Sequence, residues 1–199
     1  MQTVADKIKS DIRSLVQSWT VMKEEVSDIQ KAYNSTDIQT ELSGKADGDP
    51  VTVTTKLTKL EFINGITMVG GLVDFFNNAA VTQGEYWSTC ENIIYGNDAA
   101  VALLSEAVEH TGDRLLELAT NIEQIFKTCN NILNDYNNNN FAVMVTNFSD
   151  EDVIHGMGIN RSLLSSGITI VEQFKKFVNN EAVATADYKV TLADWVNVQ

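Results

Sequence analysis

The chain has 199 residues, 44% of them hydrophobic, which is enough to bury a core without disulfide bonds or a structural metal. Its formal net charge of −13 argues against nucleic acid and anionic membranes as partners, because phosphate binding requires clustered Lys and Arg. Two cysteines within apolar helical patterns, an N-terminus without an apolar leader and no stretch of membrane-spanning length predict a soluble protein made in a cytoplasm.

The first predicted element is a long amphipathic helix over residues 8–33. Its apolar residues are spaced alternately by fours and threes, and most residues between them are polar or charged. The members of this apolar seam are Ile8, Ile12, Leu15, Trp19, Met22, Val26, Ile29 and Tyr33. We therefore predict that this helix packs along another helix, with Ile12, Leu15, Trp19 and Met22 in the contact.

After the first helix, residues 35–57 are a polar linker. Pro50 marks a turn in this linker, and the β-branched residues 51–54 are typical of a short strand. The linker ends where Thr58 and Glu61 have the spacing of a capping box, which predicts that a helix begins there.

That helix is predicted to end at Asn77–Asn78, a pair of residues that tolerates left-handed backbone. Residues 82–85 repeat the capping-box spacing, and Gly96 is a typical helix terminator. A second, shorter helix is therefore expected between them.

Residues 98–136 predict a second long helix, whose apolar seam passes through Gly112 without a change of phase, so Gly112 is expected on the outer face. The seam consists of Val101, Leu104, Val108, Thr111, Leu115, Leu118, Ile122, Ile125, Cys129, Ile132 and Tyr136, of which Leu118, Ile122 and Ile125 are the main contact candidates. A second polar linker, residues 138–159, carries a strand-like run at 142–145. We predict that this run pairs with 51–54 in a minor two-stranded β-ribbon.

The two halves of the chain resemble each other. Residues 65–94 align with 167–196 without a gap, and the long helices align at a shift of 103, with a one-residue change of register in the linker. These alignments predict a tandem duplication, with repeats at 1–97 and 98–199 packed as one pseudo-symmetric unit. The predicted fold is an all-α bundle of two long heptad helices and two helical hairpins. Pairing of the long helices within one chain or between chains remains open.

No combination of residues points to catalysis, a cofactor or a metal. Glu106 and His110 share a helix face, but two groups do not make a metal site. The acidic turns at 47–49 and 150–152 lack the ligand spacing of a calcium loop, so they are interpreted as solvated turns or helix-start acids. We expect no catalytic, cofactor-binding or metal-binding residue.

Two features within the shorter helices are more specific. Gly65, Gly70 and Gly71 lie inside a capped helical pattern, which favours close approach of another backbone over a phosphate loop. Trp87 aligns with Lys189, so Trp87 is a candidate exposed anchor in a protein interface.

An acidic, Asn-rich, helical chain with a repeated Gly-Ile-Thr…Phe…Asn-Asn-x-Ala-Val…Tyr block resembles small all-α proteins of tailed-bacteriophage virions, such as neck, adaptor or capsid-attached components. The resemblance implies a virion component made in the host cytoplasm, a homo-oligomer that contacts other virion proteins, and no catalysis. Our main hypothesis is accordingly a non-enzymatic connector between other subunits. The alternative is a cytoplasmic, acidic helical binding module, of the regulator or immunity type, that engages a basic protein.

Overall fold

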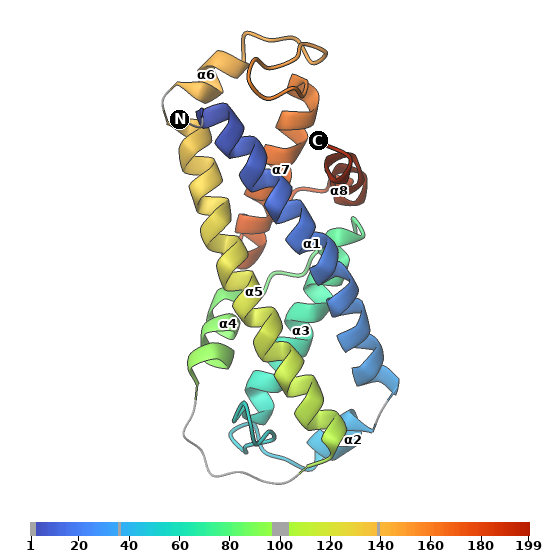
Figure 1. Cartoon of the computed structure of the whole chain (residues 1–199). Coiled ribbons are helices and arrows are strands. Elements are labelled where there is room, and N and C mark those ends of the chain that lie inside the picture. The colour runs from blue at the N-terminus through green and yellow to red at the C-terminus, as the bar shows by residue number, and fades with distance from the viewer. Residues whose placement is uncertain (1–2, 36, 97–103, 139) are drawn as a thin grey trace.

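The computed structural model describes residues 3–35, 37–96, 104–138 and 140–199, and this part of the chain is all-α and contains no strand (Figure 1). The helices are α1 (Val4–Ser35), α2 (Ile38–Ser43), α3 (Lys59–Phe76), α4 (Tyr86–Tyr95), α5 (Glu106–Asn137), α6 (Phe141–Val145), α7 (Arg161–Val178) and α8 (Tyr188–Val196). The predicted all-α class is confirmed. Helices recur in the same order in the two halves, and α1 and α5 have 32 residues each, while α3 and α7 have 18 each.

The two long helices, α1 and α5, pack along each other and run in opposite directions (Figure 1). The predicted contact residues of both seams are all buried: Ile12, Leu15, Trp19 and Met22 in α1, and Leu118, Ile122 and Ile125 in α5. These seam residues are therefore covered within the one chain that the structure describes.

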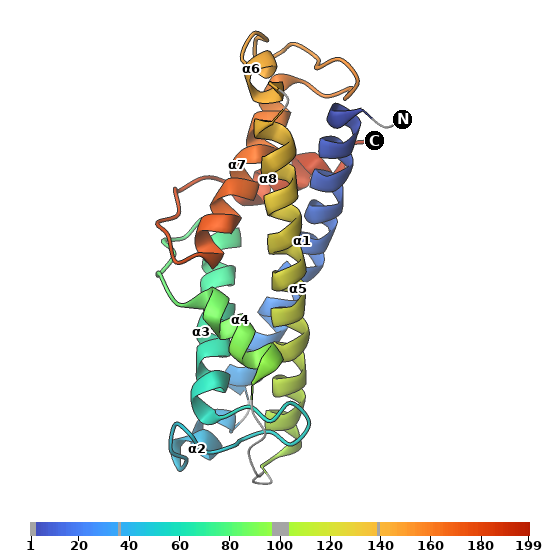
Figure 2. The same ribbon diagram turned by 90° about the vertical axis from the view of Figure 1, so that its left-hand side faces the viewer.

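Two helical hairpins, α3–α4 and α7–α8, cover the same side of the long pair (Figure 2). Within its own half, α3 packs on α1, whereas α4 packs on α5 of the other half. In the same way α7 packs on α5 and α8 on α1. Each hairpin thus bridges both long helices, and one continuous core results.

Local hydrogen bonds place the helix ends where the sequence predicts them. Thr58 caps α3 in a complete capping box with Glu61, and the Asn160 side chain caps α7. Asn78 and Asn180 have positive φ angles of 57° and 60° in the turns that follow α3 and α7. The predicted capping box at 82–85 is wrong: α4 begins at Tyr86, because the chain turns tightly where the Tyr86 N–H donates to the Gly84 carbonyl.

The linkers before α3 and α7 share a set of hydrogen bonds at offsets of 102 or 103 residues. The paired bonds are Ala46 N to Asp49 Oδ2 (2.8 Å) with Ser149 N to Asp152 Oδ2 (2.8 Å), and Lys59 Nζ to the Lys45 carbonyl (2.8 Å) with Arg161 Nη1 to the Phe148 carbonyl (2.9 Å). A single antiparallel bridge closes each linker, Pro50 with Thr58 and Val153 with Asn160. The change of register thus falls in the loop that each bridge closes, because the loop at 52–56 is one residue longer than the loop at 155–158.

The predicted β-ribbon is wrong. Residues 142–145 belong to α6, because Phe141 and Val145 are four residues apart and both point into the core, which requires a helical turn. Residues 51–54 form a loop in which the Thr52 hydroxyl accepts from Leu57 N (2.8 Å) and bonds the Thr55 hydroxyl (2.6 Å). Figure 1 shows that the two segments lie at opposite ends of the molecule.

The start of the second long helix also differs from the prediction. It begins at Glu106 behind a Ser105 cap, and residues 98–103, with the predicted seam residue Val101, lie outside the described part. Gly112 is buried, so its predicted position on the outer face is wrong. The loop that contains Thr52 covers it so closely that an added Cβ would lie 2.6 Å from Thr52 Cγ2. The Glu109 carboxylate holds that loop in place, because it accepts hydrogen bonds from the backbone N–H groups of Val53 and Thr54, at 2.6 Å each.

A candidate protein-docking groove

The contact candidates named from the sequence lie in the core. The seven seam residues form no free surface in this structure. Trp87 is half-buried, and its ring packs on Phe126 of α5, with centroids 4.7 Å apart and planes tilted by 40°. A role for Trp87 as an interface anchor stays a prediction.

The groups that could support chemistry are placed as follows. Burial raises the pKa of Cys90 to about 12 and also raises the pKa of Cys129, so neither thiol is a nucleophile near neutral pH. His110 and Glu106 are exposed on α5. Within the described ranges, no three His, Cys, Asp or Glu side chains are grouped in a way that could hold a metal ion.

None of the helices in the described residues combines the length and the apolar character that crossing a bilayer would require.

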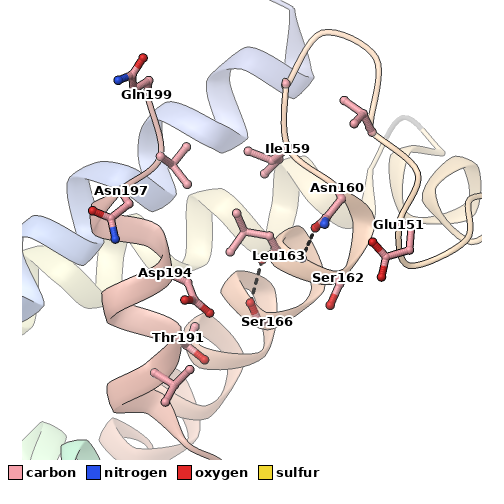
Figure 3. A pocket seen from close by; sticks show the side chains of 14 residues that line it. Glu151, Ile159, Asn160, Ser162, Leu163, Ser166, Thr191, Asp194, Asn197 and Gln199 are labelled. Carbon is pink, nitrogen blue, oxygen red and sulfur yellow. Dashed lines mark hydrogen bonds between the residues drawn. The ribbon is translucent and has the colours of Figure 1, made fainter.

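A groove of about 990 Å³ lies between α7, α8 and the loop that precedes α7 (Figure 3). We call it the α7–α8 groove. Its apolar lining consists of Val153, Ile159, Leu163, Val190 and Val198, and its polar lining of Glu151, Asn160, Ser162, Ser166, Thr191, Asp194, Asn197 and Gln199. The groove therefore combines apolar surface, neutral polar groups and carboxylates.

The first turn of α7 forms one wall of the groove, and its backbone donors are already used. Leu163 N donates to the Asn160 side chain (2.9 Å), while Arg161 N and Ser162 N donate to the carbonyls of Asp152 (3.0 Å) and Asp150 (3.1 Å). A helix N-terminus attracts anions through free N–H groups. Because these N–H groups are bonded within the chain, this wall offers no such donors to a ligand.

Helix α8 forms the opposite wall, and Trp195 fixes it on α7. The indole Nε1 donates to the Leu163 carbonyl (3.1 Å), and the ring covers Gly167, where a Cβ would lie 2.7 Å from it. Gly167 thus permits the close contact between the helices that shapes the groove. The close approach of a backbone that the sequence predicted at Gly65, Gly70 and Gly71 of α3 is wrong. A Cβ at Gly65 or Gly71 would meet side chains, and one at Gly70 would meet no atom within 4 Å.

The charges of the groove are unbalanced. Glu151 and Asp194 lie on opposite sides of it, with Ser162 and Leu163 between them (Figure 3). Neither carboxylate forms an ion pair with another residue of the described part, and no Lys, Arg or His is found among the described residues that line the groove. Two apolar side chains beside them are largely in solvent, Val153 at 61% and Val190 at 53% exposure.

The groove was not predicted from the sequence, which assigned residues 150–152 to a solvated turn or to helix-start acids. A signal was present in the alignment of the halves. At a shift of 102, Val190 and Asp194 replace Ser88 and Asn92, so the second half has gained apolar surface and negative charge at aligned positions of α8.

Comparisons of the chain with protein-family models, with curated proteins and with solved structures found no match, so the groove is interpreted from its geometry.

Proposed function

We propose that the protein is a non-enzymatic structural subunit that connects other proteins in an assembly, and that the α7–α8 groove is one of its docking sites. The observation that carries this proposal is that the linkers at the two ends of the molecule are built by matching hydrogen bonds but bear different side chains. Related but unlike ends can bind two unlike neighbours. A connector requires this property.

The proposal includes a tandem duplication, with repeats at 1–97 and 98–199 whose long helices are a heptad pair closed within one chain. Matching helix lengths and matching linker bonds support it. Two reciprocal ring stacks across the middle of the molecule also support it. The ring centroids of Phe75 and Tyr188 are 4.5 Å apart, and so are those of the aligned residues Phe177 and Tyr86. Such reciprocity is the property of an isologous contact between two equal units.

The setting that we propose is the virion of a tailed phage, where the chain contacts further copies of itself and other virion proteins. The resemblance in composition and repeated sequence supports this setting, and so does the compact all-α fold. The direct test is quantitative mass spectrometry of purified particles that contain the wild-type chain, Val190→Arg or Val21→Arg. Val21 is 65% exposed on α1 and lies away from the groove, so it is the matched control.

We expect wild type and Val21→Arg in particles at equal copy number and Val190→Arg at a strongly reduced number, because a bulky cation fills the groove. A wild-type chain that is abundant in the lysate and missing from particles would contradict the structural role.

A second candidate, a cytoplasmic module that binds one basic protein, is favoured by the carboxylates of Glu151 and Asp194, which have no ion-pair partner among the described residues. Light scattering distinguishes the two: a defined homo-oligomer supports the connector, whereas a salt-sensitive one-to-one complex with a basic protein, formed outside any particle, supports the module.

A further inference from the structure

We infer that the occupant of the α7–α8 groove is a short amphipathic segment of another protein, with apolar side chains along one edge and Lys or Arg beside them. The inference rests on the proposed function as a protein-binding subunit and specifies the partner's chemistry. A groove of about 990 Å³ is at the upper end of the range of ligand sites, about 300–1,000 Å³, so it accepts several side chains of one segment.

The free groups of the groove select cations over anions. The backbone N–H groups in the first turn of its α7 wall are not free, because Arg161 N, Ser162 N and Leu163 N are bonded within the chain. Glu151 and Asp194 provide carboxylates without an ion-pair partner in the described part. A Lys or Arg side chain can approach either carboxylate with little desolvation, because both are exposed.

The apolar part of the inference comes from Val153 and Val190, which flank the groove and are more than half exposed. Covering them removes apolar surface from water, and this stabilises a complex in a way that does not depend on salt. An occupant with charge alone would leave both valines in solvent. An amphipathic segment covers the valines and pairs the carboxylates at the same time.

The first half of the chain provides an internal comparison. At aligned positions it has Gly48 for Glu151, Ser88 for Val190 and Asn92 for Asp194. Each of these three differences adds either a carboxylate or apolar surface to the second half only. A shared need to fold does not explain them, since Glu151, Val190 and Asp194 are all exposed. The net charge of −13 adds a long-range attraction for a basic partner.

The test uses the full chain and a fluorescein-labelled synthetic helix with Leu at its heptad positions and Lys beside them. The comparison peptide has Glu in place of each Lys. Binding is measured by fluorescence anisotropy at about 20 and 150 mM salt, ionic strengths at which screening of exposed charges differs widely. Circular dichroism confirms that each variant is folded.

Two variants have equal net charge and differ only in where the charge is removed. Glu151→Gln/Asp194→Asn removes both groove carboxylates, and Glu24→Gln/Asp113→Asn removes two exposed carboxylates of the long helices. We expect the groove variant to raise the Kd of the Lys peptide about five- to tenfold at low salt and the control to raise it less than twofold. Val190→Ser should raise the Kd about fivefold at both salt concentrations, and the Glu peptide should not bind.

Equal effects of the two charge variants, or no binding of the Lys peptide, would overturn the basic character of the occupant. That failure is distinguishable from failure of the proposed function. If Val190→Arg is lost from particles while removal of both carboxylates leaves the Kd of the Lys peptide unchanged, the groove remains a docking site. The basic character of its occupant is then rejected. If Val190→Arg enters particles normally, the groove is not a docking site, and the inference fails with the proposal.

Discussion

Gly70 and Gly71 are adjacent in α3, and the same substitution should have opposite effects at the two positions. At Gly70, an added Cβ would meet no atom within 4 Å. Alanine is favoured over glycine in a helix interior by about 1 kcal/mol. Gly70→Ala should therefore raise the free energy of unfolding by about 1 kcal/mol.

At Gly71, an added Cβ would lie 2.7 Å from the Tyr86 hydroxyl oxygen and 3.1 Å from Phe177 Cε2. Tyr86 cannot move away freely, because its hydroxyl donates to the Thr82 carbonyl (2.7 Å) and its ring stacks on Phe177. Overpacking of a core costs about 1–3 kcal/mol, which exceeds the helix-propensity gain of about 1 kcal/mol. Gly71→Ala should therefore destabilise the protein by about 1 kcal/mol, a difference of about 2 kcal/mol between the two variants.

Urea unfolding followed by circular dichroism at 222 nm measures both free energies, and an unchanged m-value identifies a change in stability rather than in the unfolded state. In thermal scans, each 1 kcal/mol corresponds to about 2–4 °C in Tm for a chain of this size. If Gly71→Ala proves as stabilising as Gly70→Ala, the contact of Tyr86 with α3 described here is wrong.

Three further predictions concern the buried seams, the Glu109 carboxylate and the two cysteines. Trp19→Asp and Ile122→Asp each bury an unpaired charge, so each should lower the free energy of unfolding by more than about 3 kcal/mol; an unchanged Tm in either would contradict the buried seam. Burial raises the pKa of Glu109, but the hydrogen bonds from two backbone N–H groups outweigh burial and hold this pKa below 4.5. The stabilisation that the Glu109 carboxylate provides is therefore complete above pH 4.5 and is lost as the pH falls through the lowered pKa. Glu109→Gln should accordingly weaken the acid dependence of the urea midpoint below pH 4.5, and identical pH profiles would refute the contribution. Cys90 and Cys129 should react with an aromatic disulfide reagent at pH 8 only in denaturant, and rapid reaction of the native protein would show that they are accessible.

Features that depend on neighbours in the sequence could be predicted. The Thr58–Glu61 box and the left-handed Asn78 involve residues within a few positions of each other, so their spacing is enough to identify them. The apolar seams were predictable for a similar reason, because a helix repeats every 3.6 residues whatever it packs against.

Features that depend on distant residues could not. The outer-face prediction for Gly112 failed because Thr52, sixty positions earlier, covers it through a loop with no periodic pattern. The groove has the same origin, since it exists only where α8 is held on α7 by the bond from Trp195 to the Leu163 carbonyl. Single residues gave no sign of either contact, although Val190 differs from Ser88 at the aligned position of the first half.

The reciprocal ring stacks connect the hairpin of one half to the hairpin of the other. Phe75, Tyr86, Phe177 and Tyr188 are all buried, and each stack joins a ring from one half to a ring from the other. Neither hairpin completes its core alone, so the halves cannot move apart without exposing these rings to water. Helices α1 and α5 are each about 48 Å long at 1.5 Å per residue, and they run past this contact from one end of the molecule to the other. The shared core therefore joins the two ends of the molecule through one set of buried contacts, as the proposed connector would require to hold two partners at a fixed separation.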